Sequence, residues 1–150
     1  MRRAMMAAAV MLVGATALQA QGRTAPAAPA RSEHPAAGTP IRVQMKQVGS
    51  RYMFEPANFT VHVGDVVEFV NVSGFPHNVQ FETTKIPGGA AEVLNRNMAQ
   101  RLGPLQGPMM TQANQTYRVS FAGAPVGTYD YFCLPHKALG MTGRITVAAH

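Results

Sequence analysis

The pattern of apolar and polar positions changes at residue 41, and short alternating segments follow from there. Alternation with a period of two is typical of strands that bury one face. The predicted strands cover residues 41–45, 52–54, 59–63, 66–71, 78–81, 116–121, 127–132 and 143–147. Seven or eight short strands separated by turn residues predict an all-β protein, either a β-sandwich or a barrel.

One stretch has a different period. Between Ala90 and Leu102, apolar residues recur at close to helical spacing. Gly-Pro pairs follow at 103–104 and 107–108, and such pairs interrupt regular structure. The sequence therefore predicts one short helix over 90–102, inserted among the strands.

The first twenty residues have the features of a signal peptide. Arg2 and Arg3 precede an Ala-rich apolar run, and small residues up to Ala20 suit cleavage. An uncleaved membrane anchor is the alternative, since the run approaches spanning length. The arginine pair leaves open whether export is general or by the twin-arginine route. Residues 21–40 are rich in Ala and Pro and predict an extended linker, so the folded domain is expected at 41–150.

Charge narrows the classes of partner. The formal net charge is +6, and it falls to +4 when Arg2 and Arg3 leave with the signal peptide. The remaining cations are scattered without a dense run, which argues against nucleic-acid binding. A redox protein with an acidic docking face is the better match for a mildly basic chain.

The only cysteine, Cys133, lies in a short loop with His136 and Met141. A lone cysteine in an exported chain is paired with another chain, free, or bound to something. A thiolate, an imidazole and a thioether together form a donor set that suits copper. Pro135 stiffens the loop, and Gly140 allows its tight return.

A further donor is expected from elsewhere in the chain. His77 follows Pro76 at the start of a predicted strand and is the main candidate, whereas His62 lies within a strand and is expected to face solvent. Two His, one Cys and a weak axial Met form the donor set of blue-copper electron-transfer sites. Four protein donors leave no position for a substrate, which argues against an enzyme. His34, His62 and His150 form no second cluster by their spacing.

Each donor also has a simpler interpretation. Zinc accepts Cys and His, although it rarely takes Met in place of a carboxylate or water. Cys133 as a buried apolar residue, Met141 as core filler and His77 as a hydrogen-bonded core histidine are the structural alternatives. Met98 and Met109-Met110 are interpreted as core or loop residues rather than as a Cu(I) delivery path. The four donors taken together are more specific than any one of them.

Two stretches resemble the plastocyanin-like members of the cupredoxin family. They are Ser73-Gly-Phe-Pro-His-Asn78 with the residues after it, and Tyr131-Phe-Cys-Leu-Pro-His136 continued to Val147. The resemblance implies an eight-stranded, cupredoxin-like Greek-key sandwich that holds one type 1 copper through His77, Cys133, His136 and Met141. It also implies that Asn78 bonds across to the Cys133 loop and ties the two ligand segments together.

The resemblance further implies electron transfer. The protein is expected to shuttle single electrons, as Cu(I)/Cu(II), between periplasmic redox partners such as a cytochrome, an oxidase or a reductase. It is expected to do so as a monomer. A periplasmic copper carrier or storage protein is the alternative. In the family the edge of the second loop histidine is the electron port, so His136 is expected to be ringed by Gly74, Pro76, Pro135 and Leu139.

Two departures from the family concern the partner. Phe132 stands where the family usually has tyrosine, and the stretch 82–85 is nearly neutral where plant members are acidic. Both features serve docking in that family, so a photosynthetic partner is not implied. Lys137, beside His136, instead predicts docking to an acidic surface.

Overall fold

The computed structural model describes residues 38–150. The expected signal peptide at 1–20, most of the linker at 21–40, and His34 lie outside the described residues. The first strand, β1, begins at Ile41. Among residues 38–150, no helix has the length and apolar character needed to cross a membrane.

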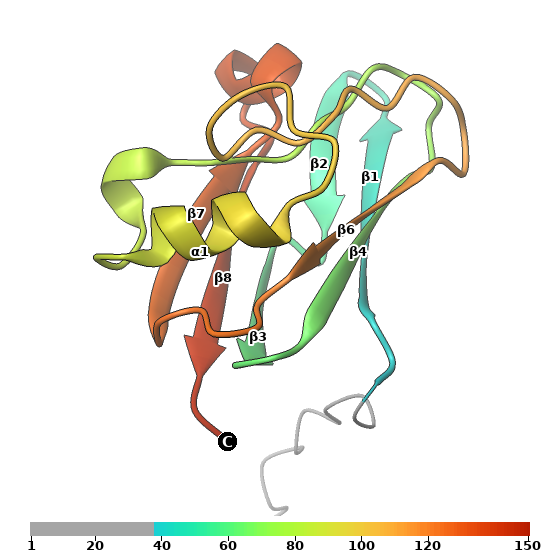
Figure 1. Ribbon diagram of the computed structural model, residues 1–150. Coiled ribbons are helices and arrows are strands. Elements are labelled where there is room, and N and C mark those ends of the chain that lie inside the picture. Colours follow the sequence, from blue (N-terminus) through green and yellow to red (C-terminus); the bar gives the residue numbers. More distant parts are fainter. Residues whose placement is uncertain (1–37) are drawn as a thin grey trace, which may run out of the picture. The chain divides into compact units, whose positions relative to one another are not determined.

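Two four-stranded sheets face each other (Figure 1). The first has the order β2-β1-β4-β6 and consists of Arg51–Glu55, Ile41–Val48, Val66–Asn71 and Thr116–Ser120. The second has the order β3-β8-β7-β5 and consists of Asn58–His62, Thr142–Ala148, Gly127–Phe132 and Gln80–Phe81. The pairs β1–β4 and β3–β8 are parallel, and the others are antiparallel. The predicted all-β sandwich with about eight strands is confirmed.

Aromatic side chains join the two sheets across the core. The Tyr131 ring of β7 lies 4.7 Å from that of Phe54 in β2 and 5.7 Å from that of Phe69 in β4. Its hydroxyl donates a hydrogen bond to the Ala57 carbonyl (3.0 Å). Gly143 passes so close that an added Cβ would lie 2.5 Å from the Tyr131 hydroxyl. Strand β8, which contains Gly143 and follows the loop from Cys133 to Met141, is therefore fixed against the core by Tyr131.

The helix is shorter than predicted. Helix α1 covers Ala90–Asn97, and Met98 leaves it with extended backbone angles. Met98 forms a β-bridge with Val119 of β6, and the Asn97 amide donates to the Ser120 carbonyl. The prediction of a helix up to 102 was wrong because pairing with a strand edge competes with the helical pattern after Asn97. The last apolar residue of that pattern, Leu102, is exposed.

The predicted strand at 78–81 is also shortened, to Gln80–Phe81. The backbone before it pairs with a loop instead of with β7. His77 and Met110 exchange two hydrogen bonds (2.9 and 2.8 Å), and the Gly107 N–H donates to the Val79 carbonyl. The segment around His77 is thus held by residues 107–110, which belong to the connection between α1 and β6.

Candidate metal centre

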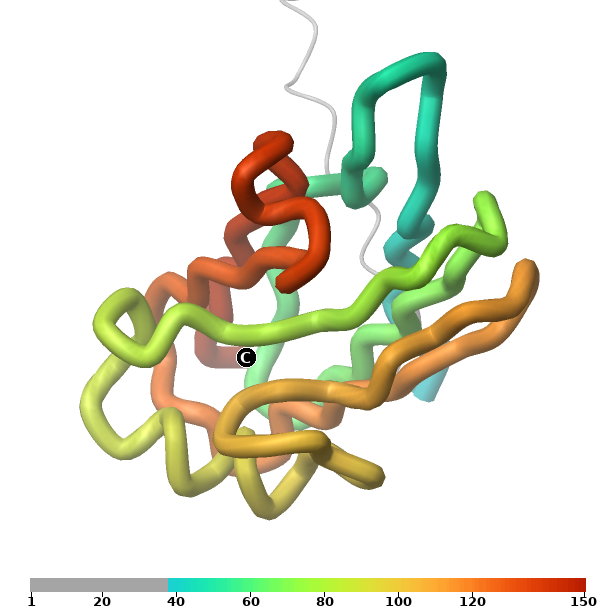
Figure 2. The backbone as a smooth tube through the Cα atoms, turned by 90° about the horizontal axis from the view of Figure 1, so that it is seen from above, coloured from blue at the N-terminus to red at the C-terminus, as the bar shows by residue number. Residues whose placement is uncertain are grey.

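Two segments meet at one end of the sandwich. The first, residues 72–79, precedes β5, and the second is the 3₁₀ helix η2 (Leu134–Leu139) that follows Cys133. A shorter 3₁₀ helix, η1 (Thr83–Lys85), follows β5. Seen from above, the green segment before β5 and the red turn of η2 lie next to each other (Figure 2). Residues 72–79 carry His77 and η2 carries His136, two of the donors predicted from the sequence.

Three predicted donors converge here. The Cys133 Sγ lies 3.6 Å from the Nδ1 of His77 and 3.5 Å from the Nδ1 of His136. The three donor atoms all lie within 4.8 Å of one another, and no other group of three His, Cys, Asp or Glu residues in 38–150 does so. His77 and Cys133 are fully buried, whereas His136 is half-buried.

These separations fit a single metal ion. Sulfur and nitrogen donors that bind one ion at about 2.0–2.3 Å stand roughly 3.5 Å apart. The third predicted loop donor, Met141, is fully buried, and its backbone lies against the same turn. The Cys133 N–H donates to the Met141 carbonyl and the Met141 N–H to the His136 carbonyl, both at 3.1 Å. Gly140, with φ of +84°, makes the turn between them possible.

Asn78 links the two segments. It is fully buried, and its side-chain oxygen accepts a hydrogen bond of 2.7 Å from the Leu134 N–H, next to Cys133. The backbone N–H groups of Asn78 and His136 also donate to the Cys133 sulfur. The sulfur is therefore held from both segments, which fixes the donor positions relative to each other.

The side chains of Asn71 and Ser73 position the segment before His77. The buried Asn71 amide donates to the carbonyls of Phe75 (2.7 Å) and Met110 (3.0 Å), and its oxygen accepts from the Gly74 N–H. The Ser73 Oγ lies 3.0 Å from the Nε2 of His77. This contact leaves the His77 Nδ1 directed at Cys133.

Tyr52 is a further residue at this centre that the sequence did not indicate. Its ring stacks on the His136 imidazole, with centroids 3.8 Å apart and planes 6° apart. The sequence placed Tyr52 in a short strand but gave no sign that this strand reaches the metal loop. Pro135 lies in the first turn of η2 and is exposed.

Burial sets the protonation of the donors. Desolvation lowers the pKa of His77 to about 4, with a smaller contribution from the charge on His136. Desolvation also lowers the pKa of His136. Burial raises the pKa of the Cys133 thiol, and the hydrogen bonds from the Asn78 and His136 backbone oppose that rise. At pH 7 both imidazoles are neutral and ready to bind, whereas the thiol still carries its proton.

This arrangement predicts the proton count of copper binding. Addition of Cu(II) at pH 7 is expected to release about one proton per chain, from Cys133, because the ligand must be a thiolate and the imidazoles are already neutral. A pH-indicator dye in weak buffer measures the release. The Cys133→Ser variant is the control and should release almost none. Additional release from the histidines at pH 7 would contradict the assignment of their pKa shifts.

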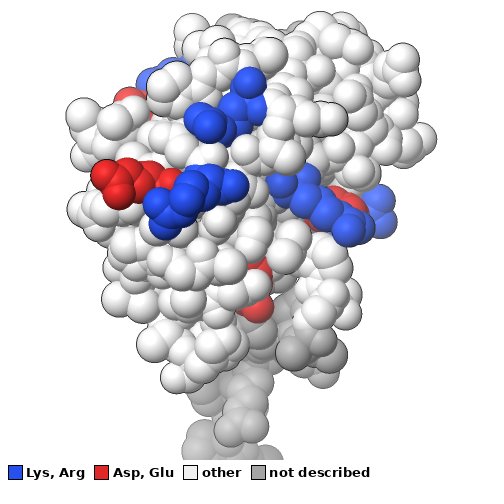
Figure 3. All heavy atoms as spheres, in the orientation of Figure 1, with Lys and Arg blue, Asp and Glu red and all other residues white. Residues whose placement is uncertain are grey.

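The residues expected around His136 lie at this end of the domain. Pro76 and Leu139 are exposed, and Gly74 is half-buried with φ of +74°. Phe75 and Leu134, exposed by 47% and 48%, add to the apolar surface. In the view of Figure 3 this end is mostly uncharged, and the Lys and Arg side chains form separate small groups, in keeping with scattered cations.

Lys137, which the sequence predicts to dock on an acidic surface, makes an ion pair within the protein. Its Nζ lies 2.5 Å from the Glu82 carboxylate and 3.8 Å from the centroid of the Phe132 ring. The ion pair offsets the charge of Lys137 within the protein itself. Its basic character toward a partner is therefore weaker than the sequence alone indicated.

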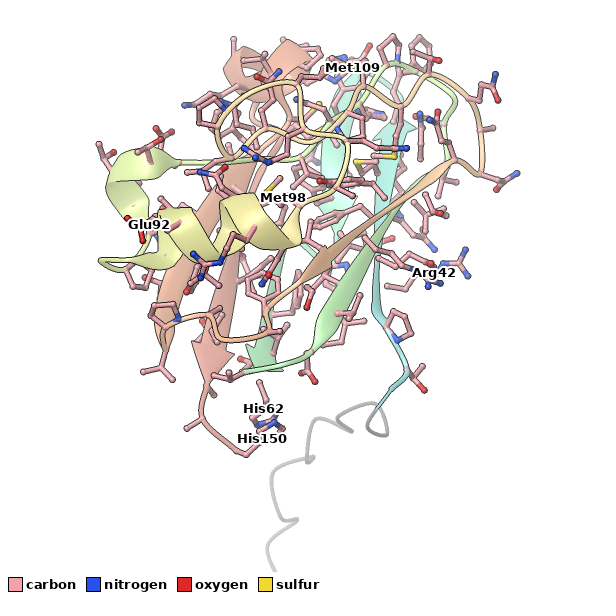
Figure 4. The ribbon with its side chains drawn as sticks, viewed as in Figure 1. Arg42, His62, Glu92, Met98, Met109 and His150 are labelled. Atoms are coloured by element: carbon pink, nitrogen blue, oxygen red, sulfur yellow. The ribbon has the colours of Figure 1, made fainter. Side chains whose placement is uncertain are left out.

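Two other histidines lie together far from this centre. His62 ends β3 and is half-buried rather than fully facing solvent, and its ring stacks on that of His150 with centroids 5.2 Å apart. Figure 4 shows the two side by side at the end of the domain opposite η2. The spacing of the two histidines in the sequence does not indicate this contact. Because a metal lies in the plane of each imidazole that binds it, two nearly parallel stacked rings (14°) are not placed to share one.

Comparison with known proteins agrees with this geometry. The model of the copper-binding proteins of the plastocyanin/azurin family matches residues 41–148. The chain belongs to this family. A plastocyanin from a Synechococcus strain is 34% identical over 114 residues, covering 76% of this chain and 77% of the relative. A plastocyanin from Scenedesmus fuscus is 35% identical over 108 residues, covering 71% and 98%.

A solved structure supports the fold of this family member. Pseudoazurin from Methylobacterium extorquens superposes with a TM-score of 0.52 at 24% identity, covering 73% of this chain and 76% of the other. Family membership confirms the predicted resemblance and the expectation of copper as the cofactor. The neighbouring His, Cys and His donors provide the place for it.

Proposed function

We propose that this protein is a type 1 copper electron carrier that cycles one copper ion between Cu(I) and Cu(II). The observation that carries the proposal is the convergence of the His77, Cys133 and His136 donor atoms from two separate segments. Met141 would complete the set as a weak fourth donor. Copper bound there supplies one-electron redox chemistry. All four ligands come from the protein, so the site is built for outer-sphere transfer and not for substrate binding.

The chain contributes a rigid frame. The Asn78–Leu134 hydrogen bond, the two N–H groups on the Cys133 sulfur and the Ser73–His77 contact hold the donors before metal arrives. A site fixed in this way changes little when an electron enters or leaves. The half-buried His136 would provide the route for the electron to a partner, since it is more exposed than His77 and Cys133.

The partner is expected to dock on the apolar surface around His136. Gly74, Pro76 and Leu139 supply it, and Lys137 stands at its side with part of its charge offset by Glu82. A redox protein such as a cytochrome, an oxidase or a reductase is the expected partner, and an acidic docking face on it remains compatible with the basic chain. The carrier is expected to act as a monomer.

The expected location is the periplasm. The proposal rests on the basic and apolar residues 1–20 as a cleaved signal peptide and on 21–40 as a linker to the domain at 41–150. Expression of the full chain in a bacterium, followed by fractionation and mass measurement, tests both. A cytoplasmic protein of full mass would contradict export with cleavage.

The test of function uses the purified protein loaded with Cu(II). An intense blue thiolate-to-copper band is expected, bleached by a reductant and restored by an oxidant over repeated cycles. The comparisons do not favour the alternative of a copper carrier, and one measurement separates the two. An electron carrier keeps its copper against a chelator while it exchanges electrons rapidly, whereas a copper carrier gives the metal up. Copper uptake without colour would refute the proposal.

Replacement of Met141 by leucine tests the proposed fourth donor. Copper should stay bound, because the two histidines and the cysteine remain, and the reduction potential should rise. The cause is that Cu(II) gains more than Cu(I) from an additional donor, so its loss favours the reduced ion. Protein-film voltammetry measures the shift. The matched control Met53→Leu, in β2, should leave the potential where it is, and an unchanged potential in Met141→Leu would show that Met141 is not a ligand.

A further inference from the structure

The two histidines of the centre are held in different ways. The Nε2 of His77 contacts the Ser73 hydroxyl at 3.0 Å. For His136, none of the described residues provides a hydrogen-bond partner for Nε2, and its ring contacts the Cys133 sulfur and the rings of Tyr52 and His77. A histidine that binds metal normally has its ring orientation fixed through the second nitrogen. The orientation of the His136 ring must therefore come from another contact.

Tyr52 makes that contact. Its ring lies nearly parallel to the His136 imidazole at a centroid distance of 3.8 Å. The Tyr52 ring also makes T-shaped contacts with the rings of Phe75 (6.1 Å, 85°) and His77 (6.1 Å, 68°). Strand β2, which carries it, pairs in register with β1 over Arg51–Glu55, so the ring is mounted on a rigid element. One face of His136 is thus covered by a side chain that cannot easily move away.

We infer that Tyr52 is a positioning residue for the copper centre: its ring holds the His136 imidazole in the plane that directs Nδ1 at Cys133 Sγ. The inference rests on the proposed function, in which His136 binds copper. The stack depends on the flat ring and not on the phenol hydroxyl. A phenylalanine can therefore replace Tyr52 in this role, and an aliphatic side chain of similar bulk cannot.

The expected effect is modest and specific. An aromatic pair favours its stacked arrangement by a free energy that corresponds to about two- to tenfold in an equilibrium constant. Tyr52→Leu should weaken Cu(I) binding by about that factor in competition with a chelator, since part of the binding energy then goes to orienting the ring. Tyr52→Phe should bind Cu(I) as the wild type does.

A second measurement is independent of copper. In the metal-free protein, NMR signals of the His136 ring protons should carry the ring-current shift of a stacked neighbour. Tyr52→Phe should keep this shift and Tyr52→Leu should lose it, while the signals of His77 stay near their wild-type positions. A purely structural role for Tyr52 would lower the unfolding free energy without this selective change at His136.

The outcomes are distinguishable. Unchanged His136 shifts or unchanged Cu(I) affinity in Tyr52→Leu would overturn the inference, as would a Tyr52→Phe variant that behaves like Tyr52→Leu. Failure of the wild-type protein to form a blue copper centre would instead refute the proposed function. In that case the metal-free NMR comparison would still decide whether Tyr52 orients His136.

Discussion

Replacement of Cys133 by serine is expected to abolish the blue absorption completely. The colour of such a centre arises from charge transfer between the thiolate and Cu(II), and Cys133 is the only cysteine of the chain. Copper affinity should fall by more than about 10–100-fold, the loss that removal of an outer partner alone can cause. Titration of the metal-free variant with Cu(II), followed by absorption and by competition with a chelator, measures both effects.

The control for Cys133→Ser is to check that the metal-free variant still folds. Serine is close to cysteine in size, so the metal-free protein should keep its strand content by circular dichroism. The buried hydroxyl is expected to lower the unfolding free energy by about 1–3 kcal/mol. A variant that folds but stays blue would show that the thiolate is not the source of the colour, and the copper assignment would then be wrong.

The strands could be predicted because alternation reports directly which face is buried. In β1, Val43 and Met45 are fully buried while Arg42 and Gln44 point outward. The end of α1 could not be predicted in the same way. Its apolar spacing continues to Leu102, and only the neighbouring edge of β6 decides that Met98 pairs with Val119 instead. Local patterns carry no information about such competition from distant strands.

The donors themselves were identifiable because ligand chemistry restricts residue type. Cysteine, histidine and methionine at close spacing on one loop, with a histidine after a proline, form an unusual combination. Tyr52 is different: an aromatic residue in a short alternating strand is typical of any β-sandwich core. Its role depends on β2 and η2 lying together across 84 residues of sequence, which no spacing rule shows. The position of Ser73 is easier to interpret from the sequence, since Ser73 lies four residues before His77 within the motif at residues 73–78.

Charge was the least reliable guide to the partner. The position of Lys137 beside His136 predicts docking to an acidic surface, but Glu82 lies 55 positions earlier in the chain and pairs with Lys137. The same holds for Arg144, which binds Asp130 through both oxygens. A net charge taken from the sequence describes long-range steering, whereas docking depends on which charges remain without a partner in the fold.

Replacement of Asn78 by alanine is expected to destabilise the metal-free protein by about 1–3 kcal/mol. The change removes the acceptor of the Leu134 N–H and leaves a gap at a fully buried position. Urea unfolding without metal measures the loss. Asn58→Ala is the matched control: Asn58 is exposed at the start of β3, and its replacement should change stability by less than about 0.5 kcal/mol.

The Asn78→Ala variant also distinguishes support of the two donor segments from direct binding of the metal. Asn78 joins the segment of His77 to that of Cys133 without its side chain being a donor to the metal, so Asn78→Ala should still turn blue with Cu(II). Its copper affinity should fall by about 10–100-fold, because the two segments must be brought together at the expense of binding energy. Full stability with unchanged affinity would show that the remaining backbone contacts, from Asn78 and His136 to the sulfur, are sufficient to hold the centre. Loss of stability with unchanged affinity would make Asn78 a residue of the fold alone.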